Sequence, residues 1–194
     1  MRAADGDAAD GALEELKRII KQIRQSWSKV HILVRADSDF CREKILTWCE
    51  RNGIDYVIGF AKNDGIIGMI DAELEEAKQK WEKTARPARI FKDIYYRTRE
   101  SWSRRRRVIA KAEHLEKGSN PRFVVTSLPK HGFEAAPVYE VLYWGRGEME
   151  NRIKEQQLGL FADRTSTATM RGNQIRFTSR QQPTCSCTLY GESV

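Results

Sequence analysis

The chain reads His31-Ile32-Leu33-Val34-Arg35-Ala36-Asp37-Ser38 over a short segment in which apolar residues give way to polar ones. This pattern is typical of a buried strand that ends near Arg35. An amphipathic helix is expected before the strand, over residues 11–27, and a second helix after it, over about residues 40–52. A further strand is expected over Ile54–Phe60. The order helix, strand, helix, strand indicates a parallel α/β layer.

The pattern changes after residue 63. Apolar residues at helical spacing predict a helix that buries one face, formed by Ile70, Leu74, Ala77 and Trp81. Three runs of strand character follow, over residues 88–98, 104–114 and 122–128, with turn-forming residues between them. We therefore expect an antiparallel meander, and after it a helix over about residues 136–157.

The charge of the chain is concentrated in one region. The 194 residues hold 34 basic and 27 acidic side chains, and the segment from Lys78 to Lys111 contains thirteen Lys or Arg against three acidic residues. A localised positive field favours a polyanion such as nucleic acid as partner, although a solvated basic surface would have the same composition. No apolar run is long enough to cross a bilayer, and the four cysteines form no zinc pattern. A cytoplasmic protein with reduced thiols is expected.

Asp37 follows the first strand directly. The carboxyl ends of strands in an open α/β sheet present side chains to ligands, and a carboxylate is a suitable Mg²⁺ ligand. The alternative is that Asp37 caps the next helix or forms a turn.

The helix expected over 136–157 carries a polar stripe beside its apolar face. The stripe includes Tyr143, Arg146, Glu150 and Lys154. A stripe in that position would partly desolvate the Glu150 carboxylate. Spacings of four residues on either side of Glu150 also suit an exposed ion-pair ladder.

Four consecutive arginines, Arg104, Arg105, Arg106 and Arg107, fall in the second strand of the expected meander. Aromatic residues lie nearby, and cations beside aromatic faces are common in grooves that bind nucleic acid. The alternative is a charged sheet edge that resists aggregation.

Two segments resemble a known family. They are Val34–Glu43, which contains Asp37, and Tyr143–Glu155, in which Tyr143 is followed by Arg146 three residues later and by Glu150 four residues after that. Together with Leu160–Thr167, they are similar to the DDE transposases of bacterial insertion sequences, and more narrowly to the insertion sequence 1380 family. The resemblance covers residues 11–176.

The resemblance implies a fold and a chemistry. It implies an α/β fold with a partial RNase H-like core and an inserted antiparallel β-rich subdomain, and the function of DNA transposition. Asp37 and Glu150 would be catalytic metal ligands for two Mg²⁺ ions, and Tyr143, Arg146 and Lys154 would contact DNA. The implied partners are DNA at the transposon ends and a full-length transposase.

The family pattern also implies domain boundaries. Residues 1–10 would be a loose leader, 11–60 the first part of the core, 61–130 the β-rich basic insertion, 131–176 the glutamate-bearing helix and the segment after it, and 177–194 a disordered, out-of-frame tail. No family-like first aspartate is assigned, so we expect a truncated enzyme that is inactive alone. The alternative function is a non-catalytic DNA-binding remnant that acts through the basic insertion.

Overall fold

The computed structural model describes residues 11–146 of the chain. Its first half has the expected alternation: helix α1 (Ala12–Ser26), strand β1 (Leu33–Ala36), the short 3₁₀ helix η1 (Ser38–Phe40), helix α2 (Glu43–Arg51) and strand β2 (Asp55–Phe60). β1 and β2 pair in parallel, with Val34 opposite Tyr56. The expected parallel α/β layer is therefore confirmed, with β1 starting two residues later than the apolar run.

The middle of the chain forms helices and then the meander. Helix α3 (Asp64–Ile67), the 3₁₀ helix η2 (Gly68–Ile70) and helix α4 (Asp71–Thr84) follow one another closely. Strands β3 (Ala88–Tyr96), β4 (Arg106–Leu115), β5 (Gly118–Ser119) and β6 (Arg122–Thr126) come next, and β3, β4 and β6 pair antiparallel. The three predicted strand runs are confirmed, although β4 begins at Arg106 and leaves Arg104 and Arg105 before it.

The meander extends the sheet that β1 and β2 begin. β6 pairs antiparallel with β2, so the strand order is β1-β2-β6-β4-β3, with β5 beside β4. The sequence did not predict this pairing, because the residues that pair, such as Val57 and Thr126, are far apart in the chain. The strands of the expected insertion thus lie in one mixed sheet with the parallel pair.

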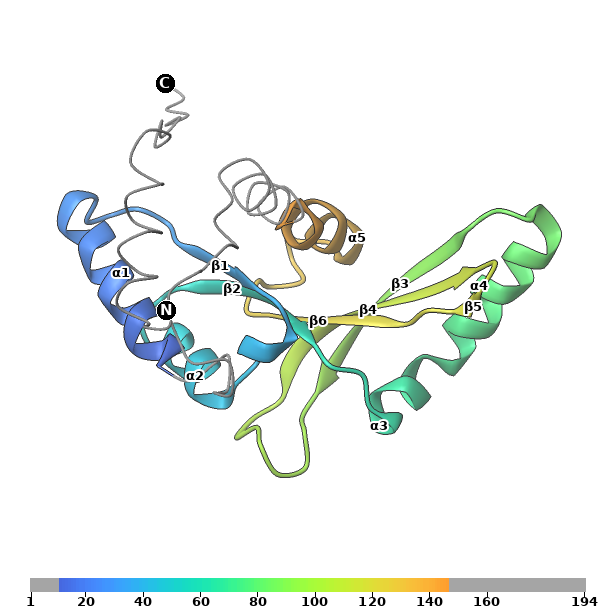
Figure 1. The fold of residues 1–194 in the computed structure, drawn as a ribbon, viewed down its shortest axis with the longest axis horizontal. Coiled ribbons are helices and arrows are strands. Elements are labelled where there is room, and N and C mark those ends of the chain that lie inside the picture. Colours follow the sequence, from blue (N-terminus) through green and yellow to red (C-terminus); the bar gives the residue numbers. More distant parts are fainter. Residues whose placement is uncertain (1–10, 147–194) are drawn as a thin grey trace, which may run out of the picture. The chain divides into compact units, whose positions relative to one another are not determined.

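Each face of the sheet carries its own apolar cluster. Because successive strand residues point to opposite faces, Tyr56 and Ile58 pack with Ile20 of α1 and Leu46 of α2, while Val57 packs on the other face. Figure 1 shows α1, α2 and α4 on one side of the sheet and α5 (Ala135–Pro137) on the other. Burying one aliphatic side chain of this kind stabilises the fold by about 1.5–3 kcal/mol.

The chain leaves the sheet through a helical segment. After α5 it continues as a π-helix, η3 (Val138–Tyr143), and a 3₁₀ turn, η4 (Trp144–Arg146). The predicted helix over 136–157 is therefore seen over its first part, and residues 147–157 lie outside the described residues.

Candidate functional site

Asp37 lies at the carboxyl end of β1, as the sequence predicts. It is the N-cap of η1, and its Oδ1 accepts a hydrogen bond from the Asp39 amide at 3.1 Å. The side chain is half-buried. The capping alternative is therefore confirmed, and a carboxylate has about four acceptor positions, so the capping bond does not by itself prevent a role as cation ligand.

Gly59 brings Asp37 and Tyr143 to one place. A methyl group at Gly59 would lie 2.6 Å from the Tyr143 hydroxyl, 2.9 Å from the Ser38 amide nitrogen and 3.2 Å from the Asp37 carbonyl carbon. Only a residue without a side chain leaves room for these three groups. The buried centre of β2 thus joins the end of β1 to the helical segment that follows the sheet, across more than one hundred positions of sequence.

The helical segment is fixed to β1 by a second contact. The Arg35 guanidinium donates a hydrogen bond to the Leu142 carbonyl at 3.0 Å, and a methyl group at Gly145 would lie 3.2 Å from the same guanidinium. Leu142 lies at the end of η3, where helix carbonyls lack intrahelical partners. The start of the helical segment is thus held beside the end of β1.

Aromatic contacts hold the same segment on the sheet. Tyr139 is buried, and its ring lies 5.5 Å from that of Tyr143. The Lys111 ammonium lies 5.4 Å from the centre of the Tyr139 ring and 5.6 Å from that of Trp144, and it forms a buried ion pair with Glu113 at 2.7 Å. A cation over two rings, balanced by a carboxylate, stabilises the position of the segment.

The expected metal ligands are only partly within the described residues. Asp37 supplies a hard oxygen donor of the kind that Mg²⁺ prefers, so it fits as one ligand. Glu150 and Lys154 lie outside the described residues, and Arg146 is their last residue. Within residues 11–146 no three His, Cys, Asp or Glu side chains gather closely enough to hold a metal ion by themselves.

The structure corrects the expectation for two of the four consecutive arginines. Arg106 is 3% exposed and pairs with Glu43 at 2.7 Å and Glu50 at 2.8 Å. Arg107 is 4% exposed and pairs with Asp93 at 2.7 Å. Since β4 lies between β6 and β3, neither arginine is at a sheet edge, and their charges are neutralised inside the protein. Arg106 and Arg107 therefore join elements of the fold, with both guanidiniums buried and paired to carboxylates.

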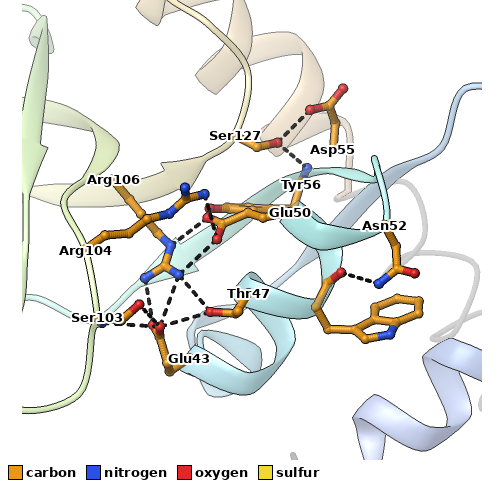
Figure 2. A network of polar contacts seen from close by, with 11 residues as sticks. Glu43, Thr47, Glu50, Asn52, Asp55, Tyr56, Ser103, Arg104, Arg106 and Ser127 are labelled. Carbon is orange, nitrogen blue, oxygen red and sulfur yellow. Dashed lines mark hydrogen bonds and ion pairs between the residues drawn. The ribbon is translucent and has the colours of Figure 1, made fainter.

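Figure 2 shows how Arg106 joins α2 to the sheet. Its guanidinium also bonds Thr47 at 3.1 Å, and Tyr56 donates to Glu50 at 2.8 Å. Burial opposes ionisation of Glu43, but the hydrogen bonds from Arg106 and from Ser103 outweigh it and lower the pKa of Glu43 to about 2. The network is thus held together by fully ionised groups near neutral pH.

The other two arginines are exposed. Arg104 pairs with Glu50 at 2.7 Å at the rim of the network, and Arg105 is exposed in the connection between β3 and β4. The sequence could not distinguish the buried pair from the exposed pair, because all four arginines carry the same charge and follow one another directly.

The described cysteines offer no reactive thiol. Burial raises the pKa of Cys41 to about 12 and that of Cys49 to about 11, so both stay protonated near neutral pH. Among the helices of the described residues, none is long and apolar enough to span a membrane.

Comparison with known proteins identifies a family that the chain matches. A family model described as "Transposase DDE domain group 1" matches residues 1–181. No curated protein matches the chain.

Proposed function

Because the chain belongs to the group 1 family of transposase DDE domains, we propose that it takes part in DNA transposition by Mg²⁺-dependent strand cleavage and transfer, within the insertion sequence 1380 group. The proposal assigns Asp37 and Glu150 as metal ligands. Tyr143, Arg146 and Lys154 are assigned to the DNA phosphate beside them. The RNase H-like character of the sheet and the role of the meander as an insertion belong to the same proposal.

The observation that supports this proposal most is the approach of Tyr143 and Asp37 around Gly59. The family pattern places Tyr143 seven residues before Glu150, which is about two helical turns. The segment that carries Tyr143 starts beside the end of β1, and the family pattern is the basis for assigning Glu150 to the same site as Asp37. The anchoring of Leu142 by Arg35 fixes that start.

The residues then have separate tasks. Asp37 and Glu150 hold the metal, which, when bound, supplies activation of the attacking oxygen and stabilisation of the leaving oxygen. The Tyr143 hydroxyl donates a hydrogen bond to a phosphate oxygen, and Arg146 and Lys154 neutralise the phosphate charge. Together these three side chains hold the scissile phosphate in line with the attacking oxygen.

Metal titration tests the ligand assignment. Calorimetry of the full chain with Mg²⁺ should show at least a tenfold loss of affinity in both Asp37→Asn and Glu150→Gln, because each removes a charged oxygen ligand. Asp39→Asn is the matched control, since it removes the neighbouring carboxylate and should leave affinity near that of the unaltered chain. Equal affinity in all four proteins would overturn the assignment.

A second function, DNA binding without strand cleavage, is favoured by the exposed arginines between β3 and β4. Nicking of supercoiled plasmid in the presence of Mg²⁺ separates the two functions. Nicking that Asp37→Asn abolishes supports catalysis, whereas plasmid binding with no nicking in the unaltered chain supports the second function.

A further inference from the structure

An open hollow beside the connection between β3 and β4 is not used by the proposed chemistry. Its volume is about 550 Å³, and we call it the basic hollow; it is lined by Met69, Tyr95, Tyr96, Arg97, Thr98, Arg99 and Arg105. In Figure 1 the connection is the light-green loop that projects from the sheet between β3 and β4.

Three guanidiniums of the basic hollow carry unneutralised charge. Arg97, Arg99 and Arg105 are all exposed, and within residues 11–146 the structure gives none of them an ion pair or a hydrogen bond. This contrasts with Arg106 and Arg107, whose partners are buried carboxylates. The connection from Arg97 to Arg105 holds four arginines against one acidic residue, so the local field is positive.

An apolar surface lies beside these charges. Tyr95 is 59% exposed and Met69 is 42% exposed, although both are large apolar residues at a folded surface. Along β3 the buried Ile94 points into the core, so its neighbour Tyr95 points outward. An exposed aromatic face among cations is the combination that contacts both the bases and the phosphates of a DNA strand.

Packing and hydrogen bonds to the rest of the fold fix the conformation of the connection. Trp102 is buried, its amide donates to the Thr98 hydroxyl at 2.8 Å, and its ring lies 5.0 Å from that of Phe60. The Tyr96 hydroxyl donates to Asn63 at 3.1 Å. A connection fixed in this way has lost much of its conformational freedom before any ligand binds, which lowers the entropy cost of binding.

Phe60 connects the basic hollow to β2, the strand that also carries Gly59. Phe60, which contacts Tyr96 and Trp102, directly follows Gly59, and Gly59 packs against the Asp37 backbone. Because successive strand residues point to opposite faces, the contacts of Phe60 and those of Gly59 lie on opposite faces of the sheet.

We propose that the basic hollow binds a DNA strand, with Arg97, Arg99 and Arg105 on phosphates and Tyr95 against a base or sugar. This inference rests on the proposed function, because it names a second contact for the same substrate. It assigns the phosphate contacts to these three arginines in place of Arg106 and Arg107.

Binding of labelled DNA by fluorescence anisotropy, without Mg²⁺, tests the proposal. The triple variant Arg97→Gln, Arg99→Gln, Arg105→Gln should bind duplex more weakly, and its slope of log affinity against log salt should be shallower by roughly 2 to 3, since each lost phosphate contact removes about 0.9. The matched control is Arg18→Gln, Lys78→Gln, Lys80→Gln, which removes three exposed, ion-paired helical cations and the same total charge. Its slope should stay near that of the unaltered chain.

Substitutions at Tyr95 test whether its ring contacts a base or a sugar of the DNA. Tyr95→Ala should weaken binding of a single strand roughly tenfold if an unpaired base stacks on the ring, and Tyr95→Phe should bind as the unaltered chain does. An equal loss on duplex and single strand points to the sugar, and both results support the proposal.

The outcomes separate this proposal from the function on which it rests. If the unaltered chain binds DNA and the triple variant matches its control, the basic hollow is excluded and the metal assignments stand. If Asp37→Asn retains Mg²⁺ affinity while the triple variant loses DNA affinity, the catalytic assignment fails and the basic hollow stands. Absence of DNA binding by the unaltered chain overturns both.

Discussion

The Tyr143 hydroxyl lies so close to Gly59 that a methyl group there would be 2.6 Å from the oxygen. Gly59 is buried in β2, which lies between β1 and β6, and two of its three nearest neighbours on that side are backbone atoms of Asp37 and Ser38. Two positions that sequence separates by more than eighty residues therefore act as one packing unit. This unit determines where the helical segment begins relative to Asp37.

Gly59→Ala tests that unit directly. The added methyl group overlaps the Tyr143 hydroxyl and the Ser38 amide, so we expect the free energy of unfolding to fall by about 1–3 kcal/mol. Urea denaturation of the full chain measures the change. Tyr143→Phe in the Gly59→Ala background should restore part of the loss, because it removes the nearest atom while leaving the backbone contact. Additive effects of the two substitutions would show that the residues do not interact.

The separation of Asp37 and Glu150 can be measured by cross-linking. If both bind the same pair of metal ions, their carboxylates should lie within about 8 Å of one another. A chain with Asp37→Cys and Glu150→Cys, and with Cys185 and Cys187 replaced by Ser, should form an intramolecular disulfide on oxidation. Asp55→Cys with Glu150→Cys is the control, because Asp55 begins β2 at the opposite end of the parallel pair. Cross-linking of the control pair alone would contradict the proposed site.

Arg106 should matter for stability far more than its neighbour Arg105. Replacing Arg106 with Ala leaves Glu43 and Glu50 without their shared cation in a largely buried setting, at a cost of about 3–5 kcal/mol. Arg105→Ala removes an exposed side chain and should change stability by less than about 0.5 kcal/mol. Thermal and urea unfolding of both variants give the comparison. Similar losses in the two variants would show that the buried network contributes little.

The same network predicts a dependence of stability on acid. The pKa of Glu43 is about 2 in the folded protein, below the ordinary value of about 4.3 for an unfolded chain. The unfolded state therefore binds a proton first as the pH falls, and the stabilisation by Glu43, complete above about pH 4.5, is lost toward pH 2. In Glu43→Gln, the free energy of unfolding should depend less on pH across that range. Glu14→Gln, on the exposed face of α1, should leave the pH dependence of the free energy of unfolding unchanged.

The sequence alone determined the order of the elements, the parallel α/β start, the meander and the place of Asp37 after a strand, because apolar spacing and turn residues are local signals. It could not separate Arg106 and Arg107 from Arg97, Arg99 and Arg105. Which guanidinium is buried depends on carboxylates from α2 and β3, and the arginine run itself carries no sign of those distant partners. The tertiary structure also decided that β6 pairs with β2 and that Gly59 admits Tyr143 beside Asp37. Both relationships join segments far apart in the chain, and only the packing of the complete sheet selects them.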